Sequence, residues 1–396
     1  MRYLTADYIF PVSSEPIKNG VIAMDDFGEI KQVGTLSEIK NPKSPVETFE
    51  GIICPGFINT HCHLELSFLK DKLTPNTRLA GFIAQVLRNR FAFSKDVMLK
   101  AIAEGEQEMI KNGIVAVGDI SNNDSTFAQK AENNLMYHTF LEVLELVAFR
   151  AEETMTNVRR LKREARGLNL ESSIVPHAPY TLSEKLLKLI NEDAKKNKGI
   201  ISIHNQESEA ENELFVSKSG ELFDLFRTMG ISYNDLRHTE KRSAQSTLRY
   251  LKDAAKILLV HNTFTDKEDI RWIKTEIRSE KCEVYFCTCP NANMFIENKL
   301  PDYNLFIDEK LDVTIGTDSL ASNWSLSILD EMKTISQHFP EIPLQTLLIW
   351  ATKNGAEFFD YEELGTIEKG KTPGLNLLKN VDGMKITKNT VVEKLI

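Results

Sequence analysis

The alternation of apolar and polar residues changes at about residue 55. Up to residue 52 the two kinds of position alternate along short stretches such as 3–10 and 20–24, and the residues 25–28 (Asp-Asp-Phe-Gly) fit a hairpin turn. This pattern predicts a small antiparallel β unit at the start of the chain.

From Gly56 onward, short apolar runs rich in β-forming residues alternate with longer stretches of helical spacing, such as 94–112 and 183–197. Eight runs with helices between them predict a closed (β/α)8 TIM barrel, and the span from Gly56 to Asp318 is close to its usual size of about 250 residues. The runs are CPGFINTH, GIVAVGDIS, MYHTFLEVL, ESSIVPHAP, GIISIHNQ, AKILLVHNT, CEVYFCTCP and LDVTIGTDS.

The end of the chain returns to strand character. A helical stretch at 325–359 precedes the segments GLNLL and MKITKNTVVEKLI. We therefore expect an α/β protein in which residues 1–55 and 366–396 together form a β-sandwich module. Residues 56–365 would form the barrel and a C-terminal helical extension. Two long crossovers, 66–93 and 207–250, are expected to form lids or walls at the barrel mouth.

Composition narrows the class of protein. With 42% hydrophobic and 27% charged residues the chain is typical of a folded protein. Its net charge of −9 argues against nucleic acid or an anionic membrane as the main partner. No stretch has the roughly 20 apolar residues of a membrane helix, and the N-terminus lacks the apolar region of a signal peptide. Five cysteines without metal-binding or disulfide-scaffold spacing favour free thiols and a cytoplasmic location.

The histidines are unusually placed. A single buried histidine is usually a hydrogen-bonded core residue, but five of the eight follow the same pattern, at the end of an apolar run. Because side chains alternate along a strand, His61 and His63 should project to one side and Cys62 to the other. Such a concentration favours a metal or catalytic site. The five are His61, His63, His177, His204 and His261.

Two acids complete this candidate site. Asp318 closes the eighth run, where barrels carry catalytic groups. Imidazoles with one carboxylate suit Zn²⁺, with Fe²⁺ or Mn²⁺ as alternatives. Glu207 lies three residues after His204. Although acids in such a loop are usually solvated, a carboxyl shielded from water would act as a general acid at neutral pH.

Together these segments resemble the amidohydrolase superfamily, specifically its branch of mononuclear aminohydrolases and chlorohydrolases. That branch includes adenosine, S-adenosylhomocysteine, guanine and aminodeoxyfutalosine deaminases. The motifs that carry the resemblance are PGFINTHCH (55–63), HAPY (177–180), HNQE (204–207), His261, CPNAN (289–293) and GTDS (316–319).

The resemblance implies a role for each matching residue. His61, His63, His204 and Asp318 match the metal ligands. Asp318 would also accept a proton from the attacking water, His261 would orient that water, and Glu207 would protonate the substrate ring. His177 matches a substrate contact, and Glu65, Asn293 and Ser319 are expected to bind substrate as well. The fourth run, ESSIVPHAP, has no lysine to bridge a second metal, so a single metal is favoured.

The resemblance implies a hydrolytic deaminase that releases ammonia from an amino-substituted N-heterocycle, such as a purine nucleoside. One alternative is hydrolysis of a cyclic amide or a C–Cl bond at the same site. Another is a catalytically silent binding scaffold. The expected partner is a small heterocyclic molecule, with a homodimer as an option.

Three other features are weaker. The segment GTIEKGKT (365–372) matches the P-loop pattern, but Pro373 disfavours the helix that a phosphate-binding loop requires. Cys287 and Cys289 are too closely spaced for the common zinc pair and are expected to pack in the core. Arg88 and Arg90 could reach an anionic substrate group, but a solvated helix face is the favoured interpretation.

Overall fold

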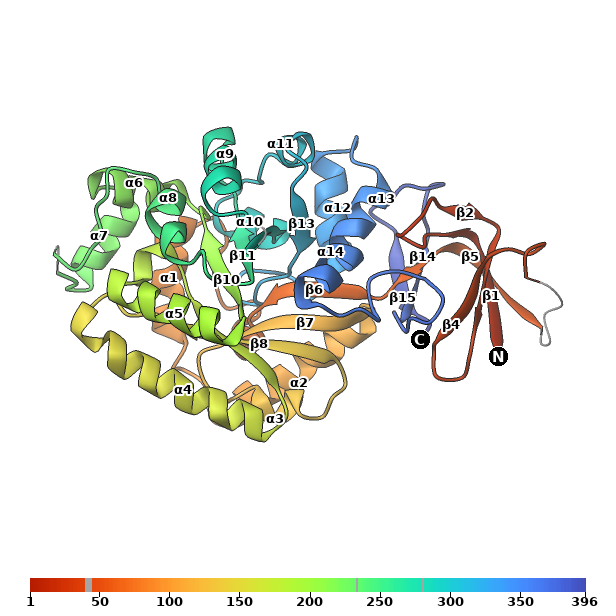
Figure 1. Ribbon diagram of the computed structural model, residues 1–396, viewed down its shortest axis with the longest axis horizontal. Coiled ribbons are helices and arrows are strands. Elements are labelled where there is room, and N and C mark those ends of the chain that lie inside the picture. Colours follow the sequence, from red (N-terminus) through yellow and green to blue (C-terminus); the bar gives the residue numbers. More distant parts are fainter. Residues whose placement is uncertain (40–44, 233, 280) are drawn as a thin grey trace.

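The computed structural model describes residues 1–39, 45–232, 234–279 and 281–396. Two four-stranded parallel sheets lie among helices on one side of the molecule, and a seven-stranded mixed sheet lies on the other, where both chain ends are found (Figure 1). The α/β class expected from the sequence is confirmed.

The parallel strands coincide with the eight apolar runs. One sheet has the order β6-β7-β8-β9 and the other β10-β11-β12-β13, so each strand pairs with its neighbours in sequence. All pairs within them are parallel. The strands are β6 (Phe57–Cys62), β7 (Ile114–Ser121), β8 (Met136–Val143), β9 (Glu171–Pro176), β10 (Ile200–Asn205), β11 (Lys256–His261), β12 (Glu283–Thr288) and β13 (Asp312–Ile315).

Backbone hydrogen bonds also connect the two sheets. His204 N donates to His177 O at 3.0 Å, which joins the end of β9 to β10. Asp318 N donates to His61 O, also at 3.0 Å, just after β13. The carboxyl ends of the first and last parallel strands are therefore held side by side.

Both faces of the parallel strands are buried, as parallel sheets require. Ala116 and Val117 are neighbours on β7 but belong to two different apolar clusters, because successive side chains point to opposite faces. The α-helices are α1 (Arg78–Asn89), α2 (Lys95–Lys111), α3 (Phe127–Lys130), α4 (Ala151–Gly167), α5 (Glu184–Asn197), α6 (Glu209–Ser217), α7 (Glu221–Thr228), α8 (Ser243–Thr247), α9 (Lys267–Glu276), α10 (Pro290–Ile296), α11 (Tyr303–Asp308), α12 (Ile328–His338), α13 (Leu344–Leu348) and α14 (Asn354–Phe359).

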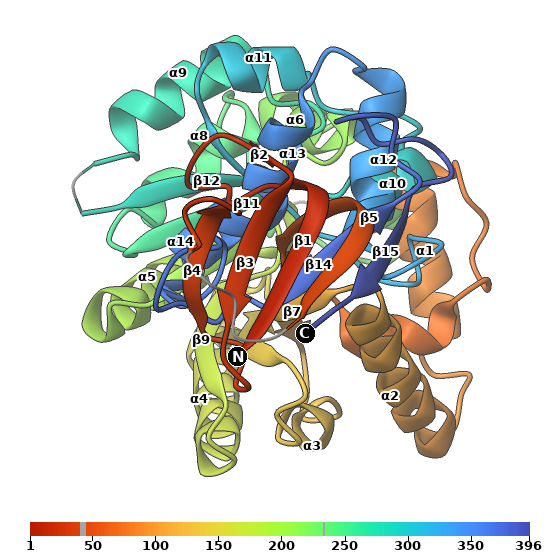
Figure 2. The ribbon, with the colours of Figure 1, turned by 90° about the vertical axis from the view of Figure 1, so that its right-hand side faces the viewer.

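The mixed sheet is built from both chain ends in the order β15-β14-β5-β1-β3-β4, with β2 beside β1 (Figure 2). The predicted hairpin is confirmed: β3 and β4 are antiparallel, and Gly28 takes the positive φ of +85° that its turn needs. The strands are β1 (Arg2–Ile9), β2 (Ile17–Lys18), β3 (Gly20–Met24), β4 (Ile30–Thr35), β5 (Val46–Pro55), β14 (Leu375–Lys379) and β15 (Val391–Lys394).

Two expectations for the chain ends were wrong. The first unit is not purely antiparallel, because the chain crosses from β4 at one edge to the far side of β1, where β5 pairs in parallel. In the tail, residues 384–388 form turns instead of a strand, with a bridge between Asp382 and Lys385. Apolar alternation over so few residues does not separate a strand from a turn.

The P-loop-like segment has a structural role. Lys371 O accepts a hydrogen bond from Ile30 N, and Ile30 O accepts one from Gly370 N, both at 2.8 Å. In the part of the chain that the structure describes, β14 follows Thr372 and no helix begins there. The rejection of a phosphate-binding loop is therefore supported.

Among the residues that the structure describes, no helix is both long and apolar enough to cross a membrane.

Candidate metal and active site

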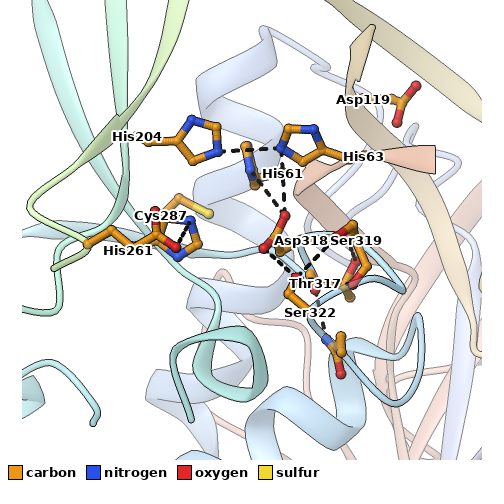
Figure 3. A network of polar contacts seen from close by, with 12 residues as sticks. His61, His63, Asp119, His204, His261, Cys287, Thr317, Asp318, Ser319 and Ser322 are labelled. Atoms are coloured by element: carbon orange, nitrogen blue, oxygen red, sulfur yellow. Dashed lines mark hydrogen bonds and ion pairs between the residues drawn. The ribbon is translucent and has the colours of Figure 1, made fainter. Parts of the chain in front are cut away.

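Side chains from both parallel sheets meet where their strands end. His61 lies on β6, His204 on β10 and His261 at the end of β11. His63 directly follows β6, and Asp318 lies three residues after the end of β13. Figure 3 shows these five side chains pointing toward one common region. The sequence-based prediction that they converge is confirmed.

Three imidazoles and one carboxylate have the spacing of metal ligands. Nitrogen atoms of His61, His63 and His204 all lie within 4.8 Å of one another. His63 Nε2 is 3.4 Å from His204 Nε2. Asp318 Oδ1 lies 3.6 Å from His63 Nε2 and 3.9 Å from His61 Nε2. The four groups surround one point with three nitrogen donors and one oxygen donor.

The chemistry of this group fits a divalent cation. His61 is fully buried, and neither of its ring nitrogens has a hydrogen-bond partner among the described residues. Burial, and secondarily the neighbouring histidines, lower the pKa of His61 and His63 well below the usual range, so both are neutral and offer lone pairs. Burial raises the pKa of Asp318, and a cation beside it would offset this cost of ionisation. A bound divalent metal would satisfy all three side chains.

The backbone brings Asp318 close to His61. A Cβ on Gly316 would lie 2.8 Å from both Cβ and O of His61, so only glycine permits this approach. Asp318 itself takes a positive φ of +55°, a conformation unusual for a side-chain-bearing residue and common at functional sites. Ser322 Oγ donates to Asp318 Oδ2 at 2.6 Å and orients the carboxylate.

His204 is oriented by its neighbours on the adjoining strands. Its Nδ1 donates to His177 O at 2.7 Å, which leaves Nε2 free to bind a cation. Glu142, at the end of β8, has Oε1 3.9 Å from the same Nδ1. Glu142 is not among the residues predicted from the sequence, although it lies near the end of the third apolar run, as Asp318 lies at the end of the eighth.

His261 and Glu207 form the second half of the site. His261 Nδ1 donates to Asn293 Oδ1 at 2.8 Å, and its Nε2 lies 3.6 Å from Glu207 Oε1. Burial, and secondarily the charge of Asp318, raise the pKa of Glu207 well above its usual range. Burial therefore favours the protonated form of the Glu207 carboxyl, which is the form that a general acid needs.

Asn293 contacts His261, whereas the sequence analysis expected it to contact substrate. If it positions the imidazole, Asn293→Ala should lower kcat by about 10²-fold with little change in KM, because small misplacement of a reacting group has effects of this size. Asn293→Asp keeps an oxygen acceptor for Nδ1 and should retain most of the activity. Steady-state kinetics of both variants test this. A raised KM with unchanged kcat would instead indicate direct substrate contact.

The other expected substrate-binding residues lie close to the candidate ligands, in space or along the chain, and have protein partners. His177 Nδ1 is 3.0 Å from Thr181 Oγ1, and burial lowers the pKa of His177 to about 4. Glu65 is buried in a short 3-10 helix (Leu64–Leu69), and burial raises its pKa to about 8. Ser319 Oγ lies 3.1 Å from Ser322 Oγ, next to the group that orients Asp318.

The two long crossovers form a cover over the strand ends. They contain α1 and the helices α6, α7 and α8. Apolar side chains of these segments pack into one cluster with residues that follow the strands, and it includes Phe68, Leu79, Tyr180, Leu214, Phe226 and Phe295. This cover explains why the candidate ligands are almost completely buried.

The two closely spaced cysteines, Cys287 and Cys289, are buried and free, as expected.

Comparison with known proteins shows the family of this chain. The model of the amidohydrolase family matches residues 52–395. An adenosine deaminase from Helicobacter pylori is 28% identical over 369 residues, which cover 90% of this chain and 86% of that protein. An aminodeoxyfutalosine deaminase from Nitratiruptor sp. is 25% identical over 378 residues, which cover 93% of this chain and 89% of that protein.

A solved structure is similar over almost the whole chain. The crystal structure of Helicobacter pylori aminofutalosine deaminase in complex with methylthio-coformycin has a TM-score of 0.82 and 25% sequence identity. The match covers 98% of this chain and 94% of that one. The similarity therefore includes the terminal sheet as well as the parallel strands.

Proposed function

The chain belongs to the amidohydrolase family, and we propose that it is a metal-dependent hydrolytic deaminase that releases ammonia from a purine-nucleoside-like substrate. One observation carries this function: a donor set of three neutral histidines and Asp318 lies beside Glu207, a buried carboxyl whose pKa is raised. The similar proteins are named as deaminases of adenosine and of aminodeoxyfutalosine, and these names support the proposed substrate class.

His61, His63, His204 and Asp318 would hold one divalent ion. Three imidazoles and a carboxylate favour Zn²⁺, with Fe²⁺ or Mn²⁺ as alternatives. When bound, such an ion supplies Lewis-acid chemistry that makes a water molecule nucleophilic near neutral pH.

The chain's own residues would move the protons. Asp318 accepts a proton from the attacking water, and His261, fixed by Asn293, orients that water against the amino-bearing carbon. Glu207 donates its proton to the adjacent ring nitrogen, which lets the carbon accept the new C–O bond. The C–N bond then breaks as the amino group takes the proton held by Asp318 and leaves as ammonia. The proton of the new C–OH group returns to Glu207, so that one water is consumed for each amino group replaced by a carbonyl oxygen.

The substrate would lie between this machinery and the cover. His177, Glu65 and Ser319 are the residues that we expect to contact it, and Asn293 would act through His261. The cover over the strand ends would exclude bulk water from the reacting atoms.

We also propose that the eight parallel strands close into a (β/α)8 barrel within residues 56–365. The hydrogen bonds from His204 N to His177 O and from Asp318 N to His61 O support closure at both seams. Residues 1–55 and 366–396 would form a β-sandwich module, supported by the hydrogen bonds that bring Ile30 of β4 against residues 370–371 of the tail. A cytoplasmic location and a possible homodimer complete the proposal.

Product analysis separates this reaction from its alternatives. Zinc-loaded protein incubated with an adenine nucleoside should release one ammonia for each nucleoside consumed, with loss of the adenine absorbance. Chloride release from a chlorinated triazine, or ring opening of a cyclic amide, in the absence of ammonia release would favour the alternative hydrolases. Absence of all three products from metal-loaded protein would favour the silent scaffold.

A further inference from the structure

We propose that a buried ion pair, Asp119 on β7 and Lys130 on α3, positions the metal site through the backbone of Leu64. Asp119 Oδ2 lies 2.6 Å from Lys130 Nζ, and both side chains are fully buried. The pair lies outside the donor set, and no step of the proposed reaction uses it. Figure 3 shows Asp119 on β7, the strand that pairs with β6, and His63 directly follows β6.

The pair is fully hydrogen-bonded, which is the condition for burying charge. Besides Asp119, Lys130 Nζ donates to Ser121 Oγ at 2.9 Å and to Thr139 Oγ1 at 3.3 Å. A buried ion pair is nevertheless a poor source of stability, since well-packed apolar residues of similar volume often stabilise a fold as well or better. The stability of the fold therefore does not account for these charges.

The other carboxylate oxygen of Asp119 binds the backbone next to a candidate metal ligand. Asp119 Oδ1 accepts a hydrogen bond from Leu64 N at 2.7 Å, and Leu64 directly follows His63. The ladder between β6 and β7 is irregular between Asn59 and Cys62, and its last pair is Cys62 with Asp119, so His63 and Leu64 lie beyond the paired residues of these two strands. The Asp119 carboxylate holds the backbone just past this last pair, and Lys130 holds the carboxylate.

The same strand end also holds Glu65. Asn122 N, three residues after Asp119, donates to Glu65 Oε2 at 3.1 Å. Asp119 and Asn122 therefore fix two consecutive residues, Leu64 and Glu65, that follow the ligand His63. We infer that the pair sets the position of His63, and through it the affinity for the metal and the value of kcat.

Zinc affinity tests the inference, which rests on the proposed metal site. In Asp119→Leu/Lys130→Met both charges and the acceptor for Leu64 N are replaced by apolar groups of similar size. We expect zinc affinity, measured by competition with a chromogenic chelator, to fall by about 10- to 100-fold, as for other groups that orient ligands. Asp119→Asn/Lys130→Met removes the charges but keeps an oxygen acceptor for Leu64 N, and should bind zinc within about threefold of wild type by the same reasoning.

Lys256→Met is the matched control, since Lys256 is a buried lysine at the opposite end of a parallel strand, paired with Asp360 at 2.6 Å. It should leave zinc affinity unchanged even if it lowers the melting temperature. Wild-type zinc affinity in folded Asp119→Leu/Lys130→Met would overturn the inference. If that variant does not fold, Asp119→Ala/Lys130→Met replaces it, with the same criterion. Absence of zinc binding by the wild-type chain would instead contradict the proposed metal site itself.

Discussion

Replacing both His61 and His63 by alanine should abolish ammonia release and zinc binding together. The two imidazoles supply half of the proposed donor set, and the Lewis-acid contribution of a catalytic metal is worth several kcal/mol of transition-state stabilisation. Because about 1.4 kcal/mol corresponds to a factor of ten in rate, kcat should fall by ~10⁴-fold or more. Metal analysis and an ammonia assay of the purified variant measure both effects.

Two histidines outside the site provide a matched control. His238 and His338 are exposed, and their rings bond only to the backbone carbonyls of Val216 and Thr334 among the described residues. The variant His238→Ala/His338→Ala should keep its zinc and its activity. Turnover at the wild-type rate in His61→Ala/His63→Ala would remove the metal site from the mechanism.

Glu207→Gln should lower kcat by about 10²- to 10⁴-fold while leaving zinc binding intact, because the amide cannot donate a proton as a general acid does. Glu207 lies outside the donor set, so its loss should separate chemistry from metal affinity. Glu209→Gln is the matched control, since Glu209 is an exposed acid at the start of α6. It should keep wild-type kcat.

The pH profile adds a second readout for Glu207. Burial raises its pKa well above the usual range, which favours the protonated form that the ring nitrogen needs. That proton is lost as the pH rises through the raised pKa, which predicts a falling alkaline limb of kcat/KM in the wild type. Glu207→Gln has no titratable group at this position and should lose that limb, although at a much lower rate. An unchanged alkaline limb in the variant would assign it to another group.

Much of the parallel-strand region could be predicted from the sequence because its signals are local. Each strand is a short apolar run, and parallel strands present their carboxyl ends to one side, so residues that close such runs meet in space. From the sequence alone, His61, His204 and Asp318 are therefore expected to lie together. Cys62 is expected on the opposite face, and it packs in the apolar cluster beneath the helices.

What could not be predicted depends on contacts between strands. The bond from His261 to Asn293, the approach of Glu142 to His204 and the ion pair of Asp119 with Lys130 all join residues of different elements. Neither periodicity nor spacing encodes such contacts. The parallel pairing of β1 and β5 was missed for the same reason, because it depends on where the chain crosses the sheet.

Zinc titration of metal-free protein, followed by ammonia release, tests the central claim most directly. Protein stripped by a chelator should release no ammonia from an adenine nucleoside or from aminodeoxyfutalosine. Activity should return in proportion to added zinc and level off at one ion per chain. Full ammonia release by the stripped protein, or none from any aminopurine nucleoside after one zinc has bound, would contradict the account.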